Sequence, residues 1–132
     1  MIVVDTTVWI DFFRAKGTRF DLHLVELIDA GAPLALTDLV YCEVLQGIRD
    51  EVSYVRVRRD LQSYPILMMR ELDRFEDAAK IYRECRARGL TIRKTIDCLI
   101  AATCLDAGAE IFHNDRDFEA IARVRNLKIH RF

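Results

Sequence analysis

The chain of 132 residues contains few of the residues that interrupt regular structure, with 5 glycines and 2 prolines. Loops and linkers are rich in these residues, so their scarcity indicates a compact fold with short connections. No internal repeat or low-complexity tract is present. We therefore expect residues 1–132 to form a single domain, which is near the commonest domain size.

Long apolar runs are also missing, since none approaches the roughly 20 residues that a membrane-spanning helix needs. The first residues, MIVVDTTVWID, carry no basic residue and reach an acid at Asp5. A secretory signal peptide has a basic start and a longer apolar stretch. We therefore expect a cytoplasmic protein with no membrane partner.

The cysteines lack the spacing of a zinc site, because none forms a CxxC pair and none has a histidine at ligand distance along the chain. A disulfide framework is not expected either. A free cysteine behaves as a small hydrophobic residue, so we expect all of them in the core. They are Cys42, Cys85, Cys98 and Cys104.

The net charge of −1 argues neither for nor against a nucleic-acid partner. Basic residues are nevertheless concentrated from Arg83 to Lys94, where five of them accompany a single acid, Glu84. A second basic group lies at residues 56–59. Either group alone is typical of a solvated helix face.

Short apolar segments alternate with helical patterns along the chain. This alternation indicates βαβ units, and therefore an α/β fold: a three-layer α/β/α sandwich around a mainly parallel sheet. We expect strands at 2–4, 33–36, 110–113 and 127–132, an apolar segment at 65–69, and helices from Thr6, at 20–31, 39–48, 51–63, 73–88 and 95–107, and from about 117.

The stretch TIDCLIAATC, residues 95–104, has one charged residue, Asp97, in an otherwise apolar or small-residue run. Thr95 can act as the N-cap of a helix here, and Asp97 would then lie in the first turn, where the helix dipole favours negative charge. Local capping therefore explains an isolated acid at this place. Asp97 is not isolated, however, if other acids converge on it.

Three further acids occupy comparable places. Asp5 ends the first strand, Asp115 follows the strand at 110–113, and Glu43 lies in an apolar helix with no basic residue three or four positions away. Asp5 and Asp115 can equally cap the helices that follow them. Because ligands of open α/β sheets bind at the carboxyl ends of the strands, we expect these acids to share a pocket with Asp97.

Carboxylates that share one pocket repel each other and raise one another's pKa. A bound divalent cation removes that penalty. A ligand set made of oxygen, without His or Cys, favours Mg²⁺, with Mn²⁺ as a substitute. Such sites hydrolyse or transfer phosphate esters.

Four segments in register resemble the PIN-domain ribonucleases, specifically the VapC-type toxins of type II (VapBC) toxin–antitoxin pairs. Together they extend over the whole chain, so the resemblance implies a PIN-like fold for residues 1–132. The segments are VVDTTVWIDFF (3–13), TDLVYCEVLQGIR (37–49), TIDCLIAATCLDAG (95–108) and IFHNDRDFEAIA (111–122).

The resemblance implies roles for individual residues. Asp117 becomes a possible fifth metal ligand, a supporting group or a cap of the last helix, and Thr7 stands where the family commonly has Ser. Asn114 is expected to orient the site. The catalytic and metal-binding acids would be Asp5, Glu43, Asp97 and Asp115, and the candidate RNA contacts Arg86, Arg88, Arg93 and Lys94.

The implied reaction is Mg²⁺-dependent hydrolysis of RNA phosphodiester bonds by an endoribonuclease toxin. The family also implies neutralisation by a VapB-type antitoxin, a toxin homodimer and a toxin–antitoxin hetero-oligomer. The antitoxin would dock in an apolar groove near residues 39–63. Its candidate contacts, each of which can equally belong to the core, are Tyr41, Val44, Leu45, Val52 and Tyr54.

Other functions remain as alternatives. A catalytically weak PIN-like module could act mainly in a regulatory complex. A Mg²⁺-binding receiver-type signalling domain needs paired acids after its first strand and a lysine after its last; this chain has DTT (5–7) and Asn114. The D-x-D pattern of haloacid-dehalogenase-type phosphatases is absent, because Asp5 is followed by Thr6 and Thr7.

Overall fold

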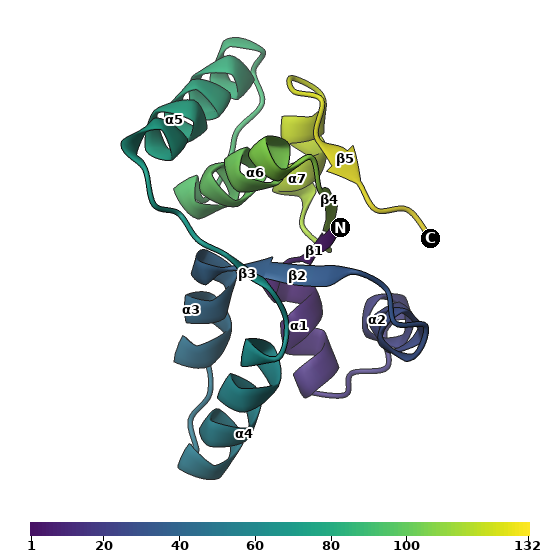
Figure 1. Cartoon of the computed structure of the whole chain (residues 1–132). Coiled ribbons are helices and arrows are strands. Elements are labelled where there is room, and N and C mark those ends of the chain that lie inside the picture. The colour runs from purple at the N-terminus through teal and green to yellow at the C-terminus, as the bar shows by residue number, and fades with distance from the viewer.

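The computed structural model describes all 132 residues and contains one five-stranded sheet (Figure 1). Its strand order is β3-β2-β1-β4-β5, and every neighbouring pair is parallel. The expectation of a mainly parallel sheet is confirmed. The strands are β1 (Ile2–Val4), β2 (Leu34–Thr37), β3 (Ile66–Leu67), β4 (Glu110–Phe112) and β5 (Lys128–Ile129).

Seven helices connect the strands, and their positions agree with the expected ones to within a few residues. The segment at 65–69, for which the sequence indicated only apolar character, contains the edge strand β3. The helices are α1 (Thr6–Phe13), α2 (Arg19–Asp29), α3 (Asp38–Gln46), α4 (Glu51–Gln62), α5 (Leu72–Ala87), α6 (Thr95–Ala107) and α7 (Arg116–Ala122).

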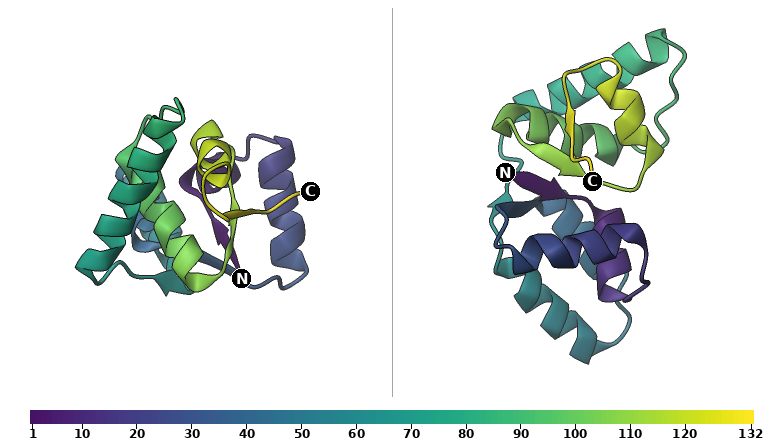
Figure 2. Two further views of the ribbon diagram at one scale, coloured as in Figure 1. Left: turned by 90° about the horizontal axis from the view of Figure 1, so that it is seen from above. Right: turned by 90° about the vertical axis from the view of Figure 1, so that its right-hand side faces the viewer.

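The helices form a layer on each face of the sheet. Helices α1 to α4 lie on one side and α5 to α7 on the other, as Figure 1 and the turned views of Figure 2 show. The three residues of β1 are buried, as a central strand covered on both faces requires. The three-layer α/β/α sandwich is therefore confirmed. None of the helices is long and apolar enough to span a membrane.

The order in which the chain adds strands to the sheet reverses between β1 and β4, which is therefore the topological switch point. From β1 it proceeds to β2 and β3 on one side, and later from β4 to β5 on the other. The register pairs Val4 with Phe112, and the Asp5 amide donates to the Phe112 carbonyl at 2.9 Å. The carboxyl ends of β1 and β4 therefore lie side by side, at the place where α/β sheets bind ligands.

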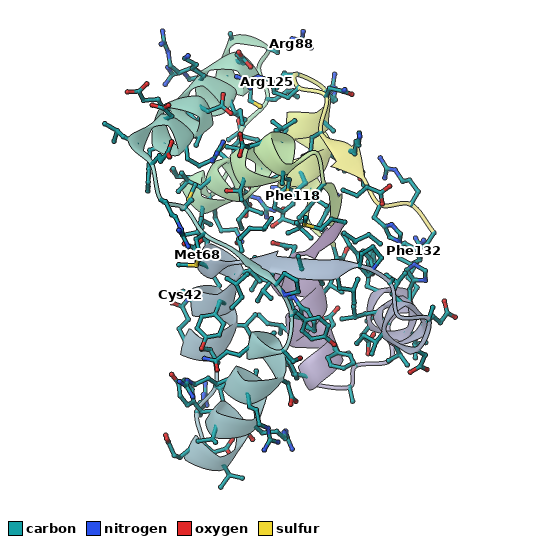
Figure 3. All side chains as sticks on the ribbon, viewed as in Figure 1. Cys42, Met68, Arg88, Phe118, Arg125 and Phe132 are labelled. Atoms are coloured by element: carbon teal, nitrogen blue, oxygen red, sulfur yellow. The ribbon has the colours of Figure 1, made fainter.

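Two local expectations were wrong. Lys94, not Thr95, is the N-cap of α6, and it makes no side-chain capping bond. Cys42 is exposed on α3, whereas the other three cysteines are buried (Figure 3). Successive helical residues are about 100° apart, so position 42 faces away from Val40 and Val44, which are buried.

Candidate metal centre

Asp5 is held at the end of β1 by the first turn of α1. Its Oδ2 accepts hydrogen bonds from the Thr7 amide at 3.2 Å and from Thr7 Oγ1 at 2.7 Å, so Asp5 caps α1. Thr7 Oγ1 in turn accepts from the Asn114 amide at 3.0 Å. The Thr7 hydroxyl therefore links the ends of β1 and β4, and Asn114 contributes through its backbone.

The pKa of Asp5 is raised to about 6 overall, and burial is the largest cause. The hydrogen bonds from Thr7 and Thr6 lower that pKa, and the nearby charge of Glu43 raises it again. Since Asp5 is only 3% exposed, water does little to stabilise its charged form.

Asp97 lies in the first turn of α6 and is 2% exposed. Its Oδ2 atom is buried and has no hydrogen-bond partner. Burial, followed by the charge of Asp5, raises the pKa of Asp97 to about 8. A buried polar atom without a protein partner is rare in folded proteins and is explained by a bound ion, a bound water or a catalytic role.

Glu43 reaches the same region from α3, but it is half-buried rather than buried as the apolar helix suggested. Thr6 Oγ1 donates to Glu43 Oε1 at 2.7 Å, which holds the carboxylate against α1. The sequence analysis predicted no role for Thr6, because it used this residue only to show that no second acid follows Asp5. Its place in the first turn after Asp5 was the available signal.

Asp115 and Asp117 approach from the β4 side and, with Asp5, Glu43 and Asp97, form what we call the acidic group, although the tight cluster within it does not include Asp5 or Glu43. One carboxylate oxygen from each of Asp97, Asp115 and Asp117 lies within 4.8 Å of the others. Asp115 caps α7 by accepting from the Asp117 amide at 3.0 Å, so the interpretation of Asp117 as the helix cap was wrong. Asp117 is only 1% exposed and lies within the acidic group.

Arg93 and Lys94, which precede α6, contact this side of the group. Arg93 donates from its amide to Asp117 Oδ2 at 3.1 Å, from Nε to Asp117 Oδ1 at 3.4 Å, and from Nη2 to Asp115 Oδ1 at 2.8 Å. Lys94 Nζ lies 3.6 Å from Asp115 Oδ2. The two basic residues therefore act as counter-charges of Asp115 and Asp117.

The pKa values of these groups reflect the same arrangement. Burial lowers the pKa of Lys94, but the charges of Asp97, Asp115, Glu43 and Asp5 outweigh it and raise the pKa overall. For Asp115, burial raises the pKa, and the Asp117 amide together with Lys94 and Arg93 lowers it overall. One lysine is thus influenced by all four acids that the sequence analysis grouped.

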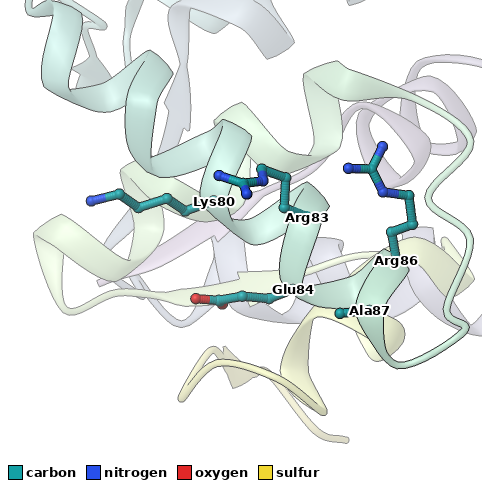
Figure 4. A pocket seen from close by; sticks show the side chains of 5 residues that line it. All are labelled: Lys80, Arg83, Glu84, Arg86 and Ala87. Atoms are coloured by element: carbon teal, nitrogen blue, oxygen red, sulfur yellow. The ribbon is translucent and has the colours of Figure 1, made fainter.

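The other two candidate RNA contacts lie elsewhere. Arg86 lines a hollow of about 440 Å³ on α5 with Lys80, Arg83, Glu84 and Ala87, and Figure 4 shows Arg83 and Arg86 extending from the same side of the helix. Arg88 follows α5 and donates to the Arg123 carbonyl at 2.7 Å (Figure 3). No residue of the acidic group lines this hollow.

The donor set suits a hard divalent cation. Every candidate ligand is a carboxylate oxygen, and such oxygens are the ligands of Mg²⁺ and Mn²⁺. Asp97, whose Oδ2 has no hydrogen-bond partner, lies in this group, and burial raises the pKa of both Asp5 and Asp97 although Lys94 lowers that of Asp97. A cation bound here would satisfy that atom and remove the repulsion.

Comparison with known proteins agrees with this geometry. A family model described as "PIN domain" matches residues 2–124. The chain belongs to the PIN domain family. It is also 36% identical to Ribonuclease VapC11 of Mycobacterium tuberculosis over 129 residues, which are 97% of this chain and 96% of that protein. Ribonuclease VapC17 of the same species is 32% identical over 76% of this chain and 83% of its own length. This PIN domain is therefore of the VapC type.

Solved structures show the same PIN fold. VapBC2 from Rickettsia felis, bound to a DNA fragment from its promoter, superposes with a TM-score of 0.76 at 19% identity and covers 98% of both chains. VapC20 of Mycobacterium tuberculosis, described as a toxin that cleaves the sarcin-ricin loop, has a TM-score of 0.70 at 20% identity, covering 97% of this chain and 99% of that one.

Proposed function

We propose that this protein is a Mg²⁺-dependent endoribonuclease toxin of the VapC type, which hydrolyses RNA phosphodiester bonds. The observation that carries the proposal is the buried, partnerless Oδ2 of Asp97 within a group of carboxylates at the reversal point of the sheet. The VapC relatives, which are named as ribonucleases, support the same reaction.

In this proposal Asp5, Asp97 and Asp115 hold the cation, with Glu43 and Asp117 completing its surroundings. A bound Mg²⁺ supplies an activated water and stabilises the leaving oxygen of the phosphodiester. The basic residues on the β4 side, Arg93 and Lys94, also face the place where a phosphate would lie. Positioning a polyanion is mainly a task of such residues.

We further propose a VapB-type antitoxin as partner, because the structural relatives include VapBC complexes. A hollow of about 240 Å³ between α1, α3 and α4 suits an amphipathic segment, since Ile10, Phe13 and Val44 line it beside Arg14 and Arg56. Residues 1–132 would act as one PIN domain in the cytoplasm. Pairing into a homodimer and a toxin–antitoxin hetero-oligomer also belongs to this proposal.

The test is cleavage of single-stranded RNA by the purified chain with Mg²⁺ and with EDTA. We expect Mg²⁺-dependent cleavage that falls about 100-fold or more in Asp5→Asn and in Asp97→Asn, because several kcal/mol of transition-state stabilisation depend on the cation. Asp29→Asn, an exposed acid at the end of α2, is the matched control and should cleave normally.

Two results would contradict the proposal. If both metal-site variants cleave as fast as the unmodified chain, the acids do not form the catalytic site. If no RNA is cleaved while the folded protein binds an antitoxin, the chain is instead a regulatory module without catalysis.

A further inference from the structure

A second feature lies beside the acidic group, in a hollow of about 450 Å³ that begins at Asn114 and Asp115 and extends to Arg19 and Phe132. We propose that Arg19 is a stacking platform for a nucleobase of the bound RNA, and that Arg116 holds the adjoining backbone phosphate. This subsite rests on the proposed ribonuclease function, because it places a nucleotide next to the bond that is cleaved.

Arg19 belongs to a stack of three side chains. Its Cζ lies 4.1 Å from the centre of the Phe132 ring, and the ring of His23 lies parallel to Phe132 at 4.3 Å with an interplanar angle of 1°. Both groups are so close to the ring centre that they would collide on one face. They therefore cover opposite faces, and Phe132 itself has no face left for a base.

The guanidinium is fixed in this position by a hydrogen bond of 2.6 Å from Arg19 Nη2 to the Phe132 carbonyl. Arg19 Cζ also lies 5.3 Å from the centre of the Phe20 ring, which meets Phe132 edge-on and so stands beside the guanidinium rather than opposite Phe132. Arg19 is exposed and lines the hollow, so its side turned away from Phe132 is open. Bases of single-stranded RNA stack on arginine guanidinium planes as they do on aromatic rings. The stack therefore offers a flat, positively charged surface of the kind that a nucleobase recognises.

The His23 end of the stack is held in place by contacts of the histidine ring nitrogens. His23 Nε2 lies 3.0 Å from His130 Nε2, and the Nδ1 atoms of His23 and His130 lie 2.9 Å from carboxylate oxygens of Glu26 and Glu110, respectively. This chain of contacts joins α2 to β4 and to the residue after β5, around Phe132. A platform held in place before binding loses little conformational entropy when the ligand arrives.

Charge in the hollow identifies the phosphate contact. Arg131 is already paired with Glu119 through two hydrogen bonds of 2.7 and 2.9 Å. Arg116, the first residue of α7 and the neighbour of Asp115, is exposed and makes no ion pair. An RNA strand that leaves the acidic group through this hollow would therefore meet Arg116 first and the plane of Arg19 next.

The test compares Arg19→Lys with Arg19→Gln, because lysine keeps the charge and loses the plane. Binding of a 12-nucleotide single-stranded RNA, and of the same RNA with one abasic position at a time, is measured by fluorescence anisotropy in EDTA, where no cleavage occurs. We expect one abasic position to weaken binding to the unmodified protein about 5- to 20-fold. Both Arg19 variants should bind the intact RNA correspondingly more weakly and lose their sensitivity at that position.

Arg116→Gln should weaken binding for every abasic position equally and should reduce the slope of log Kd against log salt by about one phosphate contact. The control is Arg59→Gln on α4, whose side chain is exposed and remote from the hollow, and it should bind like the unmodified chain. Circular dichroism of each variant confirms that the fold is retained.

Several results would overturn the inference. One is that Arg19→Lys binds RNA as tightly as the unmodified chain, and another is that no abasic position weakens binding. A third is that the unmodified chain does not bind RNA at micromolar concentration. The last is that the Arg19 variants no longer bind an antitoxin peptide but still bind RNA. Failure of the ribonuclease proposal is distinguishable, because RNA would then remain uncleaved with Mg²⁺ while Arg19-dependent base binding persisted in EDTA.

Discussion

The two sides of the acidic group balance their charges in different ways. On the β1 and α6 side, Asp5 and Asp97 are buried and make no ion pair, and their pKa values are raised by burial even though the charge of Lys94 lowers that of Asp97. On the β4 and α7 side, Asp117 is buried and Asp115 half-buried, and Arg93 lies against both. Although burial raises the pKa of Asp115, the hydrogen bond from the Asp117 amide, followed by the charges of Lys94 and Arg93, lowers that pKa overall.

This difference separates a structural ion pair from a site prepared for a ligand. For a buried carboxylate, a protein counter-ion and satisfied hydrogen bonds offset the cost of removing the charge from water. A buried carboxylate without one lowers the stability of the fold and persists where a ligand or a reaction needs it. The β1 and α6 side is therefore where we expect the cation to contribute most.

The largest effect is expected from Asp97→Asn, measured as thermal unfolding in EDTA. The pKa of Asp97 is about 8 in the folded protein and near its ordinary value of 3.8 when unfolded, so the folded state binds the extra proton. Stability should therefore fall as pH rises from about 4 to about 8. We expect the unmodified chain to melt about 8 °C or more lower at pH 8 than at pH 5.

Asp97→Asn should remove most of that pH dependence and melt higher than the unmodified chain at pH 8. Asp5, whose pKa is about 6, should leave a smaller dependence between pH 4 and 6. Adding Mg²⁺ at pH 8 should stabilise the unmodified chain and not the variant. Equal melting temperatures at pH 5 and pH 8 for the unmodified chain would show that Asp97 is not held in an unfavourable charge state.

Removal of a charge from the other side should have the opposite sign. Arg93→Gln removes the partner of Asp115 and of Asp117, which is 1% exposed, and leaves their carboxylates to repel one another. Because the Arg93 side chain is 47% exposed, water limits the loss, and we expect the melting temperature to fall by about 4–6 °C.

The matched control for this change is Arg86→Gln on α5, which removes the same group from a residue that makes no ion pair. Its melting temperature should remain within about 2 °C of the unmodified chain. If Arg93→Gln is as stable as this control, the contacts of Arg93 do not balance the buried acids.

The sequence was sufficient for the layers of the fold and for the position of Asp5 and Asp115 at neighbouring strand ends. The β-branched residues 2–4 predict a strand buried on both faces, and parallel strands place their carboxyl ends together, so Asp5 and Asp115 were expected to meet. Helix 95–107 was recognised at its observed bounds because no charged residue lies between Asp97 and Asp106. These features depend on local pattern and on the geometry of parallel sheets alone.

The contacts between distant elements could not be predicted in this way. Periodicity shows which face of a helix is apolar, but not which neighbour that face meets, so the bond from Thr6 to Glu43 was missed. Arg93 was expected to contact RNA, and only the approach of the α6 start to α7 shows that it contacts Asp117.

The smallest effect on stability is expected from Thr6→Val. This change tests whether Glu43 acts together with Asp5 and Asp97, the acids that make no ion pair. Valine keeps the shape of threonine but removes the hydroxyl that donates to Glu43 Oε1. Glu43 is half-buried and can exchange that bond for water, so the melting temperature should change by no more than about 2 °C.

Groups that orient a metal ligand typically change metal affinity by 10- to 100-fold, and we expect about tenfold weaker Mn²⁺ binding by calorimetry. Thr6→Ser retains the donor and should bind Mn²⁺ like the unmodified chain. Equal affinity in the valine variant would place Glu43 outside the cation's surroundings and leave Asp5 and Asp97 as the ligands on that side.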